Sequence, residues 1–178
     1  VIVTEDKRFF QHHGVDFRGI LRAVYVNIKE GRIVQGGSTI TQQLAKNLFL
    51  TPERSYTRKL HELILSIWLE LRFSKKQILS IYLNRVYLGS GTYGVQAASE
   101  KYFNKKVEDL NLYECAVIAS LLKAPSRFNP IANKSLSQER ASLVLENMAK
   151  SKMISKAKVK EAKSNNKKYS KFTTPPKS

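Results

Sequence analysis

The chain has 178 residues, 42% of them hydrophobic, which is enough apolar material for the core of an ordinary domain and excludes a chain too polar to fold. With 31 Lys and Arg against 14 Asp and Glu the formal net charge is +17, so we expect an anionic partner: nucleic acid, an acidic lipid surface or a phosphorylated substrate. No continuous apolar run of roughly 18 to 20 residues occurs, which excludes a bilayer-spanning helix within this sequence.

In chain order, the first informative stretch is TEDKRFFQHHG at residues 4–14. Glu5 and Asp6 precede an aromatic pair, and such surroundings partly remove water from a carboxylate, as a general base in an enzyme requires. A helix-capping role for Asp6 is the alternative. The two histidines are adjacent and point to different sides of any regular element, so we expect no zinc site.

Residues 15–34 follow with the pattern of an amphipathic helix. One apolar face carries Phe17, Ile20, Val24 and Ile28. The basic residues of this segment lie off that face, which is typical of a helix that rests on an anionic lipid surface. An ordinary helix packed on a protein core has the same pattern, and spacing leaves both interpretations open.

The stretch VQGGSTITQQLAKN at residues 34–47 contains paired glycines followed by a helix start. Thr39 and Gln42 form a capping-box pattern, and the apolar spacing continues the helix beyond them. The N–H groups at such an end attract phosphate or sugar oxygens, and Lys46 lies about two turns further on. A capped helix with a solvated basic face is the alternative, and the absence of G-K-[ST] excludes a Walker-type loop.

The next helix carries RKLHELIL at residues 58–65. Arg58 and Lys59 lie four and three residues before Glu62, so the three side chains share one face. From spacing alone, a surface ion-pair ladder is the favoured interpretation. His61 and Glu62 do not continue to the second His of a zinc-binding H-E-x-x-H motif.

Helical spacing recurs through residues 60–71, 78–83, 112–122 and 140–150, whereas alternating strand patterns are scarce, so we predict a mainly α fold. Cys115 lies in an apolar run and is predicted to be a buried thiol. Residues 151–178 hold nine Lys against one Glu, with weak periodicity, and little order is expected beyond about residue 160. We therefore divide the chain into a domain at 1–150 and a basic C-terminal segment or linker at 151–178.

Five segments together resemble a known family. EDKRFFQHHG, GGSTITQQ, RKLHE, KKQILSIYLN and YLGSGTYGVQAASEKYF resemble, in order and spacing, the five successive motifs of the peptidoglycan glycosyltransferases of family 51, as found in class A penicillin-binding proteins. The resemblance covers residues 1 to about 150. It departs at His61, where the family usually has Lys or Arg, and at Asn104, where it usually has Gly.

The resemblance implies a mainly α, lysozyme-like helical domain with a small membrane-facing lobe. Its implied activity is the polymerisation of lipid II into β-1,4-linked glycan, with inversion and release of polyprenyl pyrophosphate. The implied partners are lipid II, the nascent glycan strand, an anionic membrane surface and a transpeptidase domain in a longer chain, with no nucleic acid. The implied location is the extracytoplasmic face of a bacterial cell membrane, and we expect the sequence to be a piece of a longer, anchored protein.

By position in the motifs, Glu5 matches the family's general base and Glu62 its second essential glutamate. The matching substrate-binding residues are Asp6, Ser38, Thr39, Gln42, Gln43, Lys46, Arg54, Arg58, Lys59 and Asn84. Pyrophosphate is already a good leaving group, so cations that stabilise its charge matter more than a proton donor. No organic cofactor and no protein-built metal site are expected, and a divalent cation, Mg²⁺ or Mn²⁺, is compatible with the reaction.

Two other classes of function are also compatible with the sequence. A lysozyme-like muramidase shares the expected fold and would release fragments from finished cell wall. A basic nucleic-acid-binding module would explain the charge of +17 and would show salt-dependent retention of DNA, but it leaves the placed glutamates unused.

Overall fold

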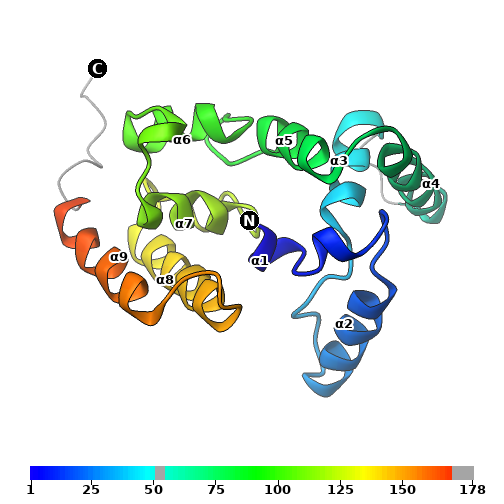
Figure 1. Cartoon of the computed structure of the whole chain (residues 1–178), viewed down its shortest axis with the longest axis horizontal. Helices are drawn as coiled ribbons and strands as arrows, with labels where there is room; N and C mark the ends of the chain where they lie inside the picture. Colours follow the sequence, from blue (N-terminus) through cyan, green and yellow to red (C-terminus); the bar gives the residue numbers. More distant parts are fainter. Residues whose placement is uncertain (51–54, 170–178) are drawn as a thin grey trace. The chain divides into compact units, whose positions relative to one another are not determined.

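The computed structural model describes residues 1–50 and 55–169, with side chains described to residue 164 (Figure 1). Helices and short 3-10 turns form its elements, and the described residues contain two isolated β-bridges but no strand, so the predicted mainly α fold is confirmed. None of the described helices has the length and apolarity needed to cross a bilayer. The chain forms two compact units: the N-terminal unit holds Ile2 and Thr4–Arg85, and the C-terminal unit holds Val1, Val3 and the residues from Val86 on.

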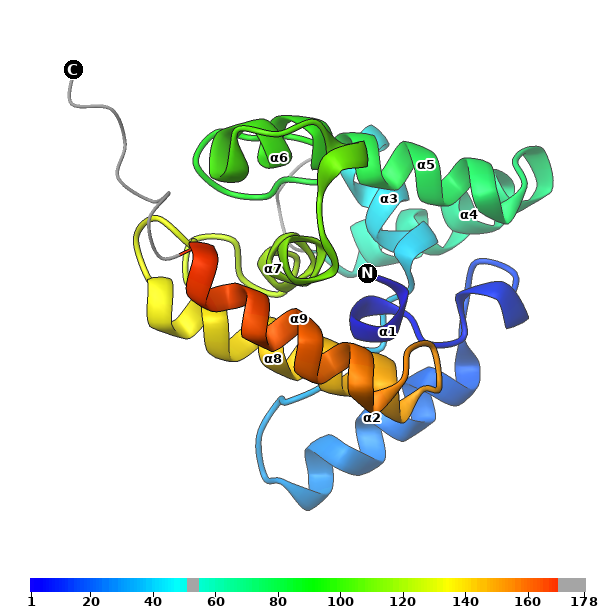
Figure 2. The ribbon, with the colours of Figure 1, turned by 60° about the vertical axis from the view of Figure 1, so that its left-hand side comes forward.

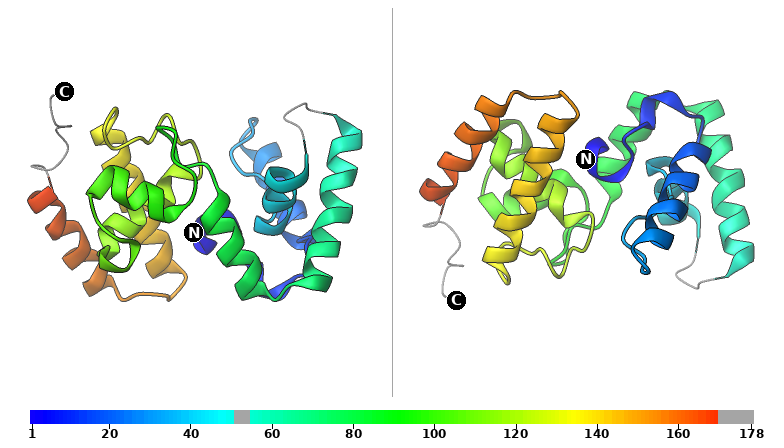
Figure 3. Two further views of the ribbon diagram at one scale, coloured as in Figure 1. Left: turned by 90° about the horizontal axis from the view of Figure 1, so that it is seen from above. Right: turned by 90° about the horizontal axis from the view of Figure 1, so that it is seen from below.

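The N-terminal unit contains five α-helices and one 3-10 turn among its described residues. They are α1 (Ile2–Glu5), η1 (Phe9–Gln11), α2 (Phe17–Lys29), α3 (Ile40–Phe49), α4 (Tyr56–Arg72) and α5 (Lys75–Arg85). Helix α3 packs against both α4 and α5 (Figure 3). It occupies this central position because apolar residues at helical spacing, Ile40 and Leu44 among them, are fully buried.

The predicted capping box starts α3. The Thr39 hydroxyl accepts a hydrogen bond from the Gln42 N–H at 3.1 Å, and the Gln42 side-chain oxygen accepts one from the Thr39 N–H at 3.0 Å. These two bonds satisfy donors that a helix end otherwise leaves open, which fixes where α3 begins.

Helix α4 is present where the apolar spacing predicts it, but its most apolar stripe faces outward. That stripe, Leu60, Ile64, Ile67 and Leu71, is exposed, whereas the buried positions are Glu62, Ser66 and Leu69. The spacing therefore predicted the helix correctly without revealing which face of it packs.

A polar cluster explains the orientation of α4. The Glu70 carboxylate accepts hydrogen bonds from the Thr41 hydroxyl of α3 at 2.6 Å and from the Lys75 ammonium of α5 at 2.7 Å. The same ammonium lies 4.4 Å from the ring centroid of Phe9. Turning α4 toward its apolar stripe would leave Glu70 and Lys75 without these partners, at a cost of a few kcal/mol in a partly buried setting.

The C-terminal unit is built around one apolar helix. Its described elements are α6 (Val95–Phe103), η2 (Val107–Asp109), α7 (Leu112–Leu121), α8 (Lys134–Lys150) and α9 (Lys156–Tyr169). Helix α7 is buried almost all round and packs against α6, α8 and α9. Its one buried charge, Glu114, accepts hydrogen bonds from Lys105 at 2.8 Å and from the Asn111 N–H at 2.8 Å, so the charge is compensated.

The expectation of little order beyond about residue 160 was wrong. Helix α9 extends to Tyr169 and runs alongside α8 (Figure 2). Val159 and Ala162, three residues apart on one face, are buried in the core cluster with α7 and α8. Two small apolar contacts thus order a helix whose composition is dominated by lysine.

Two single-residue predictions had opposite outcomes. Asn104 ends α6 in the left-handed region at φ 52° and ψ 43°, so the turn usually made by glycine is kept, as predicted. Cys115 is exposed rather than buried, because α7 turns this one position outward. An apolar neighbourhood in sequence did not determine the side on which the thiol lies.

Gly14 lets the segment before α2 approach α4 closely. Its φ is +82°, its carbonyl accepts a hydrogen bond from the Thr39 hydroxyl at 2.6 Å, and a Cβ at this position would lie 3.0 Å from the Ser66 carbonyl oxygen. A side chain is therefore opposed by both the backbone conformation and a rigid neighbouring backbone atom.

We expect Gly14→Ala to destabilise the chain by about 3 kcal/mol, which lowers the melting temperature by roughly 6 to 10 °C. Gly31→Ala is the matched control, because Gly31 also has positive φ (+62°) but no atom within 4 Å of its Cβ position. It should cost only about 1 kcal/mol. Equal losses in the two variants, measured by thermal unfolding, would show that the approach to Ser66 contributes nothing.

Candidate functional site

A hollow of about 160 Å³ in the N-terminal unit collects the residues that the motifs single out. It is lined by Ser38, Gln42, Gln43, Lys46, Arg58, Lys59 and Glu62. All seven belong to the predicted site, and they come from the turn before α3, from α3 itself and from α4. The sequence motifs are therefore brought together by the packing of α3 against α4.

Glu62 holds two cations in the wall of this pocket. Its side chain is 5% exposed, and its oxygens lie 2.7 Å from the Lys59 ammonium and 3.3 Å from the Arg58 Nε. The Lys59 ammonium also donates to the Ser38 hydroxyl at 3.0 Å. The ion pairs predicted from the spacing are present, but the acidic partner is buried and all three residues line a pocket, so they do not form an ordinary surface ladder.

The charge of the pocket is positive. Lys46, Arg58 and Lys59 stand against the single carboxylate of Glu62, and no acidic side chain in residues 1–50 and 55–164 forms an ion pair with Lys46. A concave surface with excess cations and side-chain amides suits a phosphate group attached to a polar ligand.

Three N–H groups at the start of α3 are already used within the chain. Those of Thr39, Ile40 and Gln42 donate to side-chain oxygens. These three groups are therefore not available to an anion, whereas the cationic side chains line the pocket.

Glu5 is connected to the pocket through an amide. The Gln43 Nε2 donates to one carboxylate oxygen of Glu5 at 3.2 Å, and the Gln43 side-chain oxygen accepts from the Tyr82 hydroxyl at 3.0 Å. Burial, and then the nearby Glu5 carboxylate, raise the pKa of Tyr82 well above its usual range. Sequence reasoning missed Tyr82, although it lies within the fourth motif, because its helical spacing predicts a core residue.

Asp6 and Thr39, both predicted to bind substrate, do not line the pocket. The Asp6 carboxylate is 3% exposed and accepts hydrogen bonds from His12 Nε2 at 2.9 Å and from the Ile40 N–H at 3.1 Å. Its capping role, the alternative interpretation, matches this position, although the helix it caps is α3. Thr39 is buried and uses its hydroxyl for Gly14 and Gln42.

The remaining predicted residues lie elsewhere. Asn84 is exposed on α5, donates to the Ser80 carbonyl of its own helix and does not line the pocket. Arg54 falls outside the described residues. His61, the departure from the family pattern, is exposed and is not among the lining residues, so the pocket is built without it.

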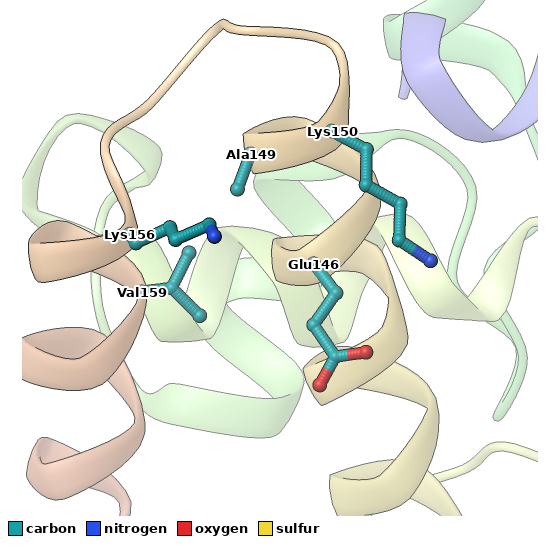
Figure 4. Close-up of a pocket in the computed structure, with 5 residues that line it drawn as sticks. All are labelled: Glu146, Ala149, Lys150, Lys156 and Val159. Atoms are coloured by element: carbon teal, nitrogen blue, oxygen red, sulfur yellow. The ribbon is translucent and has the colours of Figure 1, made fainter.

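A second, larger hollow of about 340 Å³ lies between α8 and α9 in the C-terminal unit (Figure 4). It is lined by Glu146, Ala149, Lys150, Lys156 and Val159. Lys163 binds Glu146 at 2.7 Å and lowers its pKa, and Figure 4 shows the Lys150 ammonium directed away from that of Lys156. None of the residues lining this hollow belongs to the predicted site, so the smaller pocket is the candidate site.

Comparisons with known proteins agree with the motifs. Residues 1–149 match the transglycosylase family. The chain is 50% identical over 161 residues to penicillin-binding protein 1A of Aquifex aeolicus (strain VF5), covering 90% of this chain and 22% of that protein. It is 51% identical over 144 residues to penicillin-binding protein 1F of Bacillus subtilis (strain 168), covering 81% and 20%.

A crystal structure of penicillin-binding protein 1A from Haemophilus influenzae is also similar, with 35% identity and a TM-score of 0.46 over 70% of this chain and 15% of that one. The chain thus spans about a fifth of the length of the curated relatives it matches.

The two interpretations of Asp6 predict different results for Asp6→Asn. If the carboxylate serves α3 and His12, its loss should cost about 2 kcal/mol and lower the melting temperature by roughly 4 to 8 °C. Asp109→Asn, on the exposed turn η2, is the control and should change stability by less than about 0.5 kcal/mol. A normal melting temperature combined with weakened substrate binding would instead assign Asp6 to the substrate.

Proposed function

Since the chain belongs to the transglycosylase family, we propose that it polymerises lipid II into β-1,4-linked glycan strands. The observation that carries this proposal is the pocket in which residues of the second and third motifs converge, with Glu5 of the first motif one amide away. A carboxylate that can take up a proton and a cluster of cations are the two elements that this reaction needs.

The cations bind the leaving group. The donor is the growing glycan, whose reducing-end sugar carries a polyprenyl pyrophosphate, and negative charge accumulates on that pyrophosphate as the bond to the sugar breaks. Lys46 from α3 and Arg58 and Lys59 from α4 line the same pocket, and we assign them to stabilise this charge. Cations held in place before the reaction stabilise a transition state by several kcal/mol, because no reorganisation is needed when the charge develops.

Glu5 acts as the base. It removes the proton from the GlcNAc 4-hydroxyl of the acceptor lipid II while that oxygen attacks the anomeric carbon of the donor sugar. One C–O bond forms, the opposite C–O bond to pyrophosphate breaks, and pyrophosphate leaves with the electron pair. Attack opposite an α-linked leaving group gives the β linkage, so the configuration inverts.

Glu62 serves this reaction by holding cations. It contacts both Lys59 and Arg58, and through Lys59 it reaches Ser38. A muramidase would require one carboxylic acid as a proton donor to the leaving sugar, and a glutamate paired with two cations is not set up for that task. The arrangement favours transfer from pyrophosphate over hydrolysis of finished glycan.

No organic cofactor enters this proposal. The described residues contain no group of three or more His, Cys, Asp or Glu that could hold a metal ion, so the described part of the chain offers no metal cage of its own. A divalent cation, Mg²⁺ or Mn²⁺, that assists the reaction would be bound mainly by the phosphates of the substrate.

The proposed location is the extracytoplasmic face of a bacterial cell membrane, with α2 as the membrane-facing lobe. Phe17, Leu21, Val24 and Ile28 on α2 are exposed, and Asp16 caps the helix by accepting from the Gly19 N–H at 2.9 Å. Ile20, which the sequence pattern placed on the same face, is half-buried. An exposed apolar face beside basic residues fits an anionic lipid surface, where the tail of lipid II also lies.

The full-length protein is proposed to carry more than this domain. The relatives named penicillin-binding proteins are about five times as long as the segment matched here, which supports a transpeptidase domain as partner in the longer chain. A nucleic-acid partner is not part of the proposal.

The proposed base can be tested with Glu5→Gln. This change keeps size and hydrogen bonding but removes the proton acceptor, so polymerisation of lipid II, followed as a glycan ladder on gels, should fall by roughly 100-fold or more. Glu108→Gln, at an exposed position on η2, is the control and should leave the ladder unchanged. Near-normal turnover by Glu5→Gln would remove Glu5 from the mechanism, and the absence of a ladder from the unmodified chain would contradict the proposed function.

Membrane contact through α2 can be separated from core packing. The double variant Leu21→Ser, Ile28→Ser should reduce co-sedimentation with anionic phospholipid vesicles about tenfold or more, while the melting temperature changes by less than about 2 °C. The matched control is Ile131→Ser, Leu143→Ser, which alters exposed apolar residues of the C-terminal unit and should sediment normally. Unchanged sedimentation of the α2 variant, or a large loss of its stability, would rule out lipid contact at this face.

A further inference from the structure

The side chains of Tyr82, Gln43 and Glu5 form a continuous hydrogen-bonded chain. Tyr82 on α5 donates its hydroxyl to the Gln43 oxygen at 3.0 Å, and the Gln43 nitrogen donates to Glu5 at 3.2 Å. The three residues are 38 and 39 positions apart in sequence and come from α5, α3 and α1. They meet because α3 packs against α5.

The direction of these bonds follows from the chemistry of the groups. A carboxylate can only accept, so the amide of Gln43 must turn its NH₂ toward Glu5. Its oxygen then faces Tyr82, which must donate. The Glu5 carboxylate therefore sets the orientation of the Gln43 amide, because in the other orientation an oxygen would face the carboxylate. The Tyr82 hydroxyl donates to the amide oxygen and so holds the amide in this orientation.

Tyr82 is suited to hold the Gln43 amide in this orientation. Its side chain is 1% exposed on a helix packed against α3, so the hydroxyl has little freedom to move. Burial and the adjacent Glu5 carboxylate raise the pKa of Tyr82, so the hydroxyl keeps its proton over the whole pH range in which the reaction would be measured. A donor that is rigid and always protonated presents the same hydrogen bond at all times.

We propose that Tyr82 is a positioning residue that acts through Gln43 to orient the carboxylate of Glu5. One oxygen of Glu5 is occupied by the Gln43 amide, which leaves the other oxygen for the acceptor hydroxyl. The role rests on the proposed function, because it assigns Glu5 the task of general base. Tyr82 is buried and is not among the residues that line the pocket.

The main test is Tyr82→Phe, which keeps the ring and removes only the hydroxyl. The Gln43 oxygen then loses its donor, the amide is held less firmly against Glu5, and kcat for lipid II polymerisation should fall about tenfold while KM changes less than twofold. Tyr102→Phe is the matched control: its buried hydroxyl donates to the Leu88 carbonyl at 2.9 Å in the C-terminal unit. It should lose similar stability in thermal unfolding and keep its kcat.

A double-mutant cycle identifies the route of the effect. If Tyr82 acts through Gln43, then Tyr82→Phe should change kcat less than twofold in a Gln43→Met background. Gln43→Met alone should lower kcat at least as much as Tyr82→Phe. A normal kcat in this single variant would contradict the relay, by which we mean the chain from Tyr82 through Gln43 to Glu5, even if Tyr82→Phe folds poorly.

Three results would overturn the relay while leaving the proposed function intact. They are a normal kcat for Tyr82→Phe, an equal loss of kcat in Tyr102→Phe, and the same effect of Tyr82→Phe with and without Gln43. Failure of the unmodified chain to polymerise lipid II is a separate observation, and it would contradict the proposed function and the relay together.

Discussion

The buried carboxylate of Asp6 is the constraint on which the arrangement of the site depends. It accepts a hydrogen bond from the first N–H of α3 and from His12, so it joins the N-terminal segment to the helix that lines the pocket. Because Asp6 is adjacent to Glu5, the same bond sets the distance from Glu5 to Gln43. A buried charge must be compensated, and here the compensation also fixes where the segment that carries Glu5 lies.

The charges of the pocket are organised by a second buried carboxylate. Glu62 lies in the pocket wall and holds Lys59 and Arg58, which limits the freedom of two long side chains. An acidic residue among cations weakens their positive field, but it also orders the cations in advance, so that a bound anion would not have to pay the entropy cost of ordering them. With Lys46 added, the balance remains positive. Positioning before the reaction is what makes such cations effective on a charge that develops only in the transition state.

The helices themselves could be predicted from local patterns, since α2, α3, α4 and α7 lie where apolar spacing places them. The face of each helix that packs against the protein could not be predicted in this way. The apolar stripe of α4 is exposed because Glu70 and its partners on α3 and α5 hold the other side inward, and no feature local to α4 reports those partners. For helix α9 the sequence predicted too little structure. Its lysine-rich composition predicted little order, but two small buried residues pack it against the core.

The sequence by itself determined the family, the mainly α class and the seven residues that line the pocket, because motif order and residue chemistry are preserved in one dimension. The roles of Glu5 and Glu62 remain predictions from that resemblance. Only the tertiary structure decided that Asp6 and Thr39 are buried and do not line the pocket, that the Ile40 N–H is bonded to Asp6, and that Tyr82 reaches Glu5 through Gln43. The physical reason is that a hydrogen bond is decided by the meeting of two groups, and here the partners are 25 to 39 residues apart, beyond what periodicity or spacing can register.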